Sequence, residues 1–246
     1  MPPSLEQRLA LRERPGQRAV MRQTWRSLLF LHWRYSPEEI QALLPPSLTV
    51  DVFDGSAWVG VVPFFMQDVR PVWLPPVPGL SNFPELNIRT YVCDAEGCPG
   101  VWFFSLDASQ PIAVVLARLF FKLPYFRARM RARVTPATVD YWSQRSGLEP
   151  DHFVWQPFAE PRLAEPGSLE FFLVERYLLY SWHARAGRLF SGRVHHRPYA
   201  LREVKVHEFG TQLLGLAGLS SRIAPPDHRI HCDGVEVEVF GLRAHK

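Results

Sequence analysis

The chain has 246 residues, a formal net charge of +4, and hydrophobic residues at 47% of its positions. This apolar content, with 13% aromatic residues, excludes a disordered chain and provides material for a packed core. No run of about 18 apolar residues and no N-terminal signal segment occurs, so we expect a cytoplasmic protein that is neither inserted into a membrane nor exported. The cysteines, Cys93, Cys98 and Cys232, are too few and too scattered for a disulfide framework.

Among the 28 basic residues only three are lysines, namely Lys122, Lys205 and Lys246. Arginine binds carboxylates and phosphates through a planar fork, but a bias in genome composition explains the same excess. Nucleic-acid binding would be supported by a contiguous basic run with interleaved aromatics or by a recognisable reading motif, and the sequence has neither. We therefore expect no nucleic-acid partner.

The first elements follow an N-terminal tail. Residues 1–20 are arginine-rich and bracketed by prolines, which predicts a segment that frays or forms a short helix. The rest of the chain, residues 21–246, is predicted to form a single domain. Residues 25–35 are strand-like, and Ser36-Pro37-Glu38-Glu39 is a capping box with proline at the first helical position. A short helix is therefore expected to run to about residue 44.

Two hairpins are predicted next, with a rigid loop between them. Residues 48–53 and 56–65 are β-rich runs around Asp54-Gly55, a strong turn signal. Residues 71–78 contain four prolines, so they cannot form a central strand and are predicted to be a loop that covers one end of a sheet as a lid. Residues 87–93 and 101–106 give the second hairpin.

The middle of the chain predicts a helix followed by a strand. Residues 107–110 can cap a helix that ends at Pro124, and its apolar residues recur at helical spacing, which predicts the main core helix: Ile112, Val115, Leu116, Leu119 and Phe120. Residues 125–134 then alternate strictly. Arg127, Arg129, Arg131 and Arg133 form an arginine ladder on one face of this strand, and a solvated face is the favoured interpretation of that ladder.

The C-terminal part predicts a short helix over residues 168–173 and a hairpin made of residues 176–182 and 189–196. A further helix is expected over residues 203–216, and a final strand over residues 235–242. Many antiparallel strands with three or four helices set among them indicate an α+β fold.

The densest group of polar residues lies on one of these strands. A period of two places Glu85, Asn87, Arg89 and Tyr91 on the same side. If that side faces inward, a carboxylate, an amide and a guanidinium meet in one cavity, which requires a ligand or partner charges. By spacing alone, the outward and solvated alternative is slightly favoured, because alternating charged residues usually mark a wet sheet face.

Four segments carry a resemblance to a known family. They are FPELNIRTYV, FFKLPYFRARM, SLEFFLVERYLLY, and the pair His195-His196 before Pro198. These segments look like the YqjF-like family of uncharacterised proteins, which resembles acetoacetate decarboxylase in fold. The resemblance covers roughly residues 23–242. It implies a closed antiparallel β-barrel or cone with a few packed helices and a central cavity, and it favours the inward orientation of Glu85.

The resemblance also implies where catalytic groups should lie. Acetoacetate decarboxylase forms an imine through a lysine just after a proline, but here Pro124 is followed by Tyr125 and Phe126, so the nucleophile is absent from its expected place. Lys122 is the nearest substitute, although an exposed lysine at a helix end is the simpler interpretation.

The acidic part of the family's pocket is retained. Glu85 resembles the family's pocket glutamate and would act as general acid or base, while Arg89 would bind a substrate carboxylate. Candidates for further substrate contacts are Asn87, Arg118, Tyr125 and Asp107, of which Asp107 is equally consistent with a plain helix cap.

Other chemistries are poorly supported. His195-His196 point to opposite strand faces, and His228-x-x-His231 lacks the partners that complete a metal site. We expect no metal and no cofactor. No Gly-x-Ser-x-Gly segment occurs, which disfavours a hydrolase triad, and the glycines at 210–218 do not follow a dinucleotide-binding pattern.

Three functional alternatives remain open. The first is a binding module for a small organic acid or carbonyl compound, and the second is a lyase or isomerase that acts on a small oxo acid through Glu85. The third is a protein-interaction module, for which the 71–78 loop and Trp73 would provide the surface. A homo-oligomer is compatible with the sequence, and no membrane partner is expected.

Overall fold

The computed structural model of this chain describes residues 2–183, 186–220 and 224–245. Its helices are α1 Leu5–Ala10, α2 Pro37–Gln41, α3 Pro111–Phe120, α4 Leu169–Val174 and α5 Gln212–Leu216. Its strands are β1 Ala19–Tyr35, β2 Thr49–Val50, β3 Ala57–Pro71, β4 Phe83–Cys93, β5 Pro99–Ala108, β6 Tyr125–Val134, β7 Val139–Arg145, β8 Asp151–Pro157, β9 Leu178–His183, β10 Arg188–His195, β11 Leu201–Arg202, β12 Val204–Glu208, β13 His228–Phe240 and β14 Arg243–Ala244.

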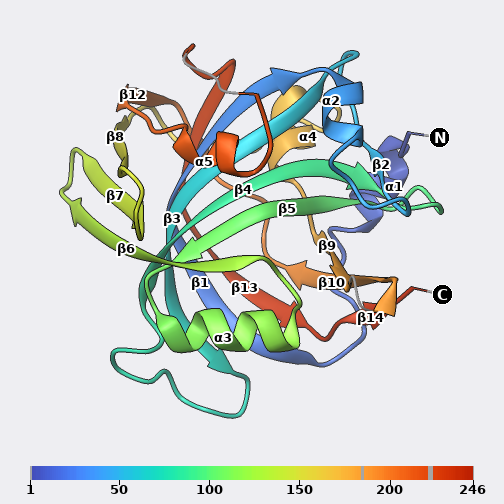
Figure 1. Cartoon of the computed structure of the whole chain (residues 1–246), viewed down its shortest axis with the longest axis horizontal. Coiled ribbons are helices and arrows are strands. Elements are labelled where there is room, and N and C mark those ends of the chain that lie inside the picture. The colour runs from blue at the N-terminus through green and yellow to red at the C-terminus, as the bar shows by residue number, and fades with distance from the viewer. Residues whose placement is uncertain (1, 184–185, 221–223, 246) are drawn as a thin grey trace.

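The strands form one sheet that closes on itself. Its pairings run from β5 through β9, β10, β13, β1, β3 and β4 and return to β5 (Figure 1). This ring confirms the predicted α+β fold with a closed sheet and few helices. The pairing is not wholly antiparallel, because β5 pairs in parallel with both β9 and β6. The β5–β6 pair is parallel because α3 forms the crossover between these strands.

A second layer extends from the ring at β6. Strands β6, β7, β8 and β12 continue the sheet outward in antiparallel order, to the left of the ring in Figure 1. The sequence analysis did not predict β7 or β8. It was wrong about residues 203–216, because residues 204–208 extend as an edge strand beside β8 and only Gln212–Leu216 is helical.

The second layer decides which way the polar face of β4 points. Leu86 and Ile88 on β4 belong to the apolar cluster that also holds Tyr141 of β7 and Trp155 of β8. The alternate residues of β4 therefore point to the inside of the ring, where Glu85 and its neighbours are buried. The outward, solvated interpretation of this face is wrong because the opposite face is already covered by apolar side chains.

Several local predictions are confirmed. The Ser36 side chain accepts a hydrogen bond of 3.1 Å from the backbone N–H of Glu39 at the start of α2. The helix itself ends at Gln41, before the predicted end at about residue 44. β4 pairs with β5 and β9 pairs with β10 as predicted hairpins, and the short helix predicted over residues 168–173 is present as α4. The arginine ladder of β6 is exposed to solvent.

The predicted hairpin around Asp54-Gly55 is only partly present. Both turn residues have positive φ, at 50° and 71°, and a single bridge joins Phe53 to Ser56. The preceding strand β2 pairs with β4 instead of β3. The hairpin prediction was wrong beyond the turn because β4 already occupies that edge of β3 along its length.

Helix α3 is not the core helix that its apolar pattern predicts. Val114 is its only buried residue, whereas the five predicted core positions are 47 to 67% exposed. The helix lies across one end of the ring, so only one of its sides meets the core (Figure 1). The helical spacing of apolar residues in α3 therefore does not mark a buried helix. It belongs to a helix that borders the open end of the ring.

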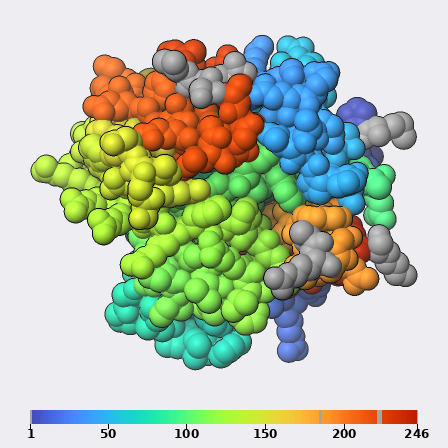
Figure 2. Space-filling model, viewed as in Figure 1, coloured from blue at the N-terminus to red at the C-terminus, as the bar shows by residue number. Residues whose placement is uncertain are grey.

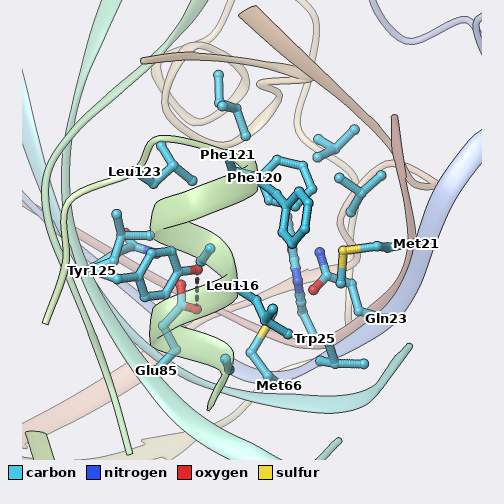
Figure 3. Close-up of a pocket in the computed structure, with 18 of the residues that line it drawn as sticks. Met21, Gln23, Trp25, Met66, Glu85, Leu116, Phe120, Phe121, Leu123 and Tyr125 are labelled. Atoms are coloured by element: carbon cyan, nitrogen blue, oxygen red, sulfur yellow. Dashed lines mark hydrogen bonds between the residues drawn. The ribbon is translucent and has the colours of Figure 1, made fainter. Parts of the chain in front are cut away.

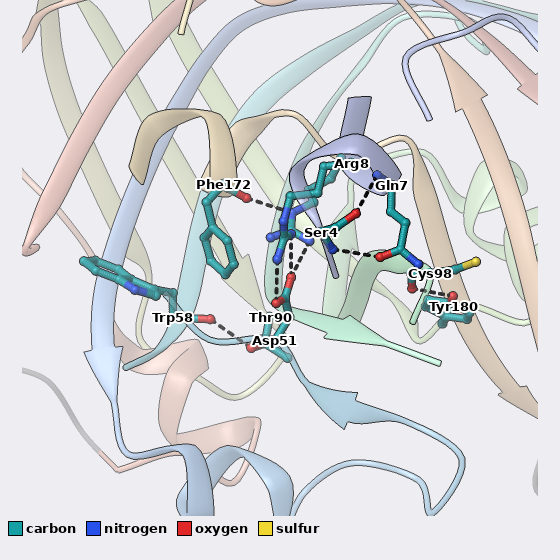
Figure 4. Close-up of polar contacts among 10 residues, drawn as sticks. Ser4, Gln7, Arg8, Asp51, Trp58, Thr90, Cys98, Phe172 and Tyr180 are labelled. Carbon is teal, nitrogen blue, oxygen red and sulfur yellow. Dashed lines mark hydrogen bonds and ion pairs between the residues drawn. The ribbon is translucent and has the colours of Figure 1, made fainter. Parts of the chain in front are cut away.

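The N-terminal segment is attached to the rest of the chain. Arg8 of α1 forms two hydrogen bonds with Asp51, at 2.7 and 2.8 Å (Figure 4). Arg12 donates a hydrogen bond of 3.1 Å to Glu175. β1 begins at Ala19, within the predicted tail. No helix among the described residues is long and apolar enough to cross a membrane.

Candidate functional site

A cavity of about 790 Å³ lies inside the ring and is bordered by α3 and by the loop between β3 and β4. Trp73, Val77 and Leu80 of this loop line the cavity, and the Gly79 carbonyl accepts a hydrogen bond of 2.6 Å from the Gln110 side chain. Figure 2 shows the green surface of α3 beside the teal surface of the loop. The predicted lid loop therefore lies at the cavity, together with α3.

Strand β4 carries the main polar lining. Glu85, Asn87 and Arg89 all line the cavity and are 3%, 5% and 8% exposed, so each polar group is almost fully removed from solvent. Successive inward side chains on a strand are about 7 Å apart. The three groups therefore form a short row along one wall.

Glu85 is held by a buried tyrosine. The Tyr125 hydroxyl donates a hydrogen bond of 2.8 Å to the Glu85 carboxylate (Figure 3). Burial raises the pKa of Glu85 to about 7, against the lowering effect of hydrogen bonds from Tyr125 and Asn87, and the nearby charge of Asp107 raises it further. A carboxyl with this pKa exchanges protons near neutral pH.

Arg89 and Asn87 retain hydrogen-bonding capacity. Arg89 donates through Nη2 to the Leu173 carbonyl at 3.3 Å, and its guanidinium lies 5.3 Å from the Phe30 ring centroid. The buried Nε of Arg89 and Oδ1 of Asn87 have no hydrogen-bond partner among the described residues. Buried groups of this kind are costly unless a ligand or water satisfies them.

Arg176 is a second guanidinium in the cavity, and the sequence analysis did not select it. Arg176 lines the cavity and donates to the Phe172 carbonyl at 2.7 Å and to Asp51 at 2.8 Å, while its Nη2 has no partner among the described residues. Its guanidinium and that of Arg89 lie 4.9 and 5.8 Å from the Tyr91 ring centroid. A charged residue inside the apolar run SLEFFLVERYLLY is the signal that identifies it.

Asp107 lies outside the cavity lining. Its carboxylate binds the Arg145 guanidinium, with Nε 2.9 and 3.0 Å from the two carboxylate oxygens. Burial raises the pKa of Asp107, and the bond to Arg145 opposes this shift. The residue is part of β5 and caps no helix, because Gln110 caps α3.

Arg118 and Lys122 also lie outside the cavity lining. Arg118 Nε donates to the Tyr125 carbonyl at 2.6 Å, so it fixes the start of β6. Lys122 occupies the turn after α3 with a φ of 54°, and its Nζ lies 5.6 Å from the Phe190 ring centroid. The structure thus brings together Glu85, Asn87, Arg89 and Tyr125, and leaves these two residues and Asp107 apart.

The histidines singled out by the sequence have other partners. His228 Nδ1 lies 3.1 Å from His32 Nδ1, and His231 accepts a hydrogen bond from Trp155. In the part of the chain that the structure describes, the one group with metal-ligand spacing is Asp94, Glu96 and Cys98. Asp94 already accepts hydrogen bonds from the backbone of the other two residues, which a turn explains.

Comparison with known proteins identifies the family. A family profile named DUF2071, described as an uncharacterized conserved protein, matches residues 22–236. The chain belongs to the DUF2071 family. A relative, the uncharacterized protein YqjF of Bacillus subtilis strain 168, is 40% identical over 188 residues, which is 76% of each chain. This confirms the resemblance found in the sequence.

Solved structures support the fold of this DUF2071 member. An acetoacetate decarboxylase from Legionella pneumophila matches with a TM-score of 0.65 and 12% identity, covering 95% of this chain and 93% of its own. The enduracididine biosynthesis enzyme MppR, in complex with pyruvate, matches with a TM-score of 0.63 and 14% identity over 94% and 93% of the two chains. An acetoacetate decarboxylase-like enzyme from Sphingomonas wittichii RW1 gives 0.63 and 15% over 94% of each chain. At these identities the likeness establishes the fold.

Proposed function

We propose that this DUF2071 member binds an oxo acid in its cavity and transfers a proton at the carbon beside the carbonyl group. The observation that carries the proposal is the row of Glu85, Asn87 and Arg89 on one buried wall, with the pKa of Glu85 raised to about 7. Along the strand, Glu85 provides a base, Asn87 an amide and Arg89 a cation. A 2-oxo acid presents an acidic C–H, a carbonyl and a carboxylate in the same order.

The cationic end holds the carboxylate. Arg89 and Arg176 both line the cavity, lie 5.8 and 4.9 Å from the Tyr91 ring centroid, and have a nitrogen without a partner among the described residues. Asp51 offsets only part of this charge, because it is shared by Arg176 and Arg8. A carboxylate between the two guanidiniums would accept these hydrogen bonds and balance the remaining charge.

The proton step takes place at Glu85. Its ionised carboxylate accepts a proton from the carbon beside the carbonyl, and the C–H electron pair moves through carbon to the carbonyl oxygen. The Asn87 amide donates a hydrogen bond to that oxygen, which stabilises the enolate. Return of the proton from Glu85 to carbon regenerates the oxo acid, so the step requires no further reactant.

The proposed step uses no imine. Among the described residues, those that line the cavity include no lysine, and Lys122 lies by the Phe190 ring. Oxo-acid chemistry is nevertheless consistent with the fold, because the structurally similar MppR holds pyruvate. The remaining alternative is a binding module without turnover, which shares the carboxylate site but not the proton step.

Exchange of hydrogen for deuterium tests the proposal. Oxo acids are incubated with the protein in D₂O, and the loss of the proton signal beside the carbonyl is followed by NMR. We expect catalysed exchange with the wild type and at least a hundredfold slower exchange with Glu85→Gln, the order of magnitude of general-base catalysis. Binding of the acid without any exchange would establish the binding module instead, and absence of binding would contradict both.

A further inference from the structure

We infer that the natural ligand is an acid with a large apolar body, of the medium-chain or aromatic type, whose carboxylate lies at Arg89 and whose body extends to α3 and the 72–82 loop. This inference rests on the proposed function and names its substrate class. Its basis is the size and the polarity of the cavity.

The cavity is far larger than a short oxo acid requires. Its volume of about 790 Å³ lies in the upper part of the range of about 300 to 1,000 Å³ in which pockets enclose drug-sized molecules. A ligand as small as pyruvate would leave most of the apolar wall in contact with water. A longer apolar body would instead bury that wall and bind more tightly for each methylene added.

The main polar row of the cavity lies on the β4 wall, and most of the remaining lining is apolar. Figure 3 shows the Glu85 and Tyr125 pair on one side, Met21 and Trp25 on the other, and apolar side chains of β3 and α3 between them. Polar side chains outside β4, among them Gln23 and Arg70, also line the cavity, and Arg70 lies where β3 meets the 72–82 loop. The β4 wall, where Arg89 lies, is therefore suited to an anionic group, and the mainly apolar lining from β3 and α3 is suited to a hydrocarbon body.

Helix α3 supplies an apolar wall that is open to solvent without a ligand. Ile112, Leu116 and Phe120 follow each other at intervals of four residues and line the cavity, although they are 51%, 47% and 67% exposed. Val115 and Leu119 of the same helix do not line it. Trp73, 75% exposed, lines the cavity from the adjacent loop. A bound apolar body would cover these surfaces, which explains apolar residues at exposed positions.

A homologous series of acids tests the inference. Straight-chain 2-oxo acids and the corresponding saturated acids of four to about twelve carbons are titrated into the protein by calorimetry. We expect the dissociation constant to fall about fourfold for each added methylene until the cavity is filled, the factor that corresponds to burying one methylene group. The matching primary alcohols, which lack the carboxylate, should bind more weakly at every length.

A matched pair of variants places the apolar body. Leu116→Asp introduces a charge on the cavity side of α3, and Leu119→Asp introduces the same charge on the same helix outside the cavity. Leu116→Asp should weaken binding of the longest acid about tenfold or more and leave a four-carbon acid unaffected, while Leu119→Asp should change neither.

The outcomes separate the two proposals. Equal affinity for short and long acids, or equal weakening by both variants, would overturn the apolar-body inference and leave the oxo-acid function standing. Absence of binding at every chain length would overturn the proposed function itself. If acids and alcohols of the same length bound equally well, the proposed binding of a carboxylate at Arg89 would be wrong.

Discussion

The Tyr125 hydroxyl lies 2.8 Å from the Glu85 carboxylate although the two residues are 40 positions apart in the chain. They meet because β4 and β6 both pair with β5, so their inward side chains reach the same cavity. The bond supplies a donor to Glu85, the one acidic residue that lines the cavity in the described part of the chain. Burial and the nearby Glu85 charge raise the pKa of Tyr125 well above its ordinary value, so this hydroxyl remains a donor throughout the neutral range.

Tyr125→Phe is expected to move the titration of Glu85 to higher pH. The hydrogen bond from Tyr125 favours the ionised form and thus lowers the pKa of Glu85, which burial raises to about 7. Carboxyl ¹³C NMR of labelled protein measures the midpoint. Tyr141→Phe is the matched control, because Tyr141 donates to the backbone carbonyl of Glu85 at 2.8 Å. A midpoint that stays at about 7 in Tyr125→Phe would contradict this role.

Glu85→Gln is expected to stabilise the protein above neutral pH. The folded pKa of about 7 exceeds the unfolded value, so the folded state binds the extra proton, and stability falls as the pH rises from about 4.5 to 7. Glu85→Gln has no ionisable group at this position, so its stability does not fall over this pH range for this reason. Its free energy of unfolding relative to wild type should rise by about 2 to 3 kcal/mol between pH 5 and pH 8. Urea denaturation at both pH values measures it, and an equal difference at the two would refute the buried ionisable state.

Asp51→Asn is expected to be strongly destabilising. Asp51 is buried and shared by Arg8 and Arg176, and although burial alone would raise its pKa, the two guanidiniums hold the pKa below its ordinary value. Removing the charge leaves Arg176 buried without its partner, which costs about 3 to 5 kcal/mol. The stability that the Asp51 charge contributes is present at neutral pH. It is lost as the pH falls below the pKa of Asp51 in the unfolded chain and through its lower pKa in the folded protein.

Asp233→Asn is the matched control for Asp51. Asp233 is 61% exposed in its side chain and lies 3.2 Å from Arg202 and 3.1 Å from His231 Nε2, so solvent screens its charge and its loss should cost less than about 1 kcal/mol. Denaturant unfolding of both variants at pH 7 makes the comparison. Equal effects of the two substitutions would show that the buried network around Asp51 contributes no more than a surface ion pair.

Most of the long strands and the polar row of β4 were predictable because period-two alternation and turn residues are local signals. The inward direction of Glu85 was indicated by the family resemblance but not by the local pattern, since it depends on Leu86 and Ile88 being covered by Tyr141 and Trp155 from strands that the sequence analysis missed. The alternate residues of the same strand, Leu86 and Ile88, are apolar, which indicates that the face opposite Glu85 is also buried.

Three failures have a common cause in long-range context. Helix α3 has the spacing of a core helix, but its position across the ring leaves its apolar residues at a cavity border. Residues 204–208 took an extended form because the edge of β8 was available for pairing. Arg176 was missed although its charge inside an apolar run was a local signal, because its position near the Tyr91 ring, which Arg89 also approaches, depends on long-range packing.

The central claim is that Arg89 places an organic anion in the cavity, and thermal-shift measurement tests it most directly. Wild type, Arg89→Ala and Arg70→Ala are compared against a panel of oxo acids and their uncharged amides. An acid at about 100 times its dissociation constant stabilises the native state by about 2.7 kcal/mol. The account predicts a raised melting temperature for wild type and Arg70→Ala and none for Arg89→Ala. A shift retained in Arg89→Ala, or produced equally by the amides, would contradict it.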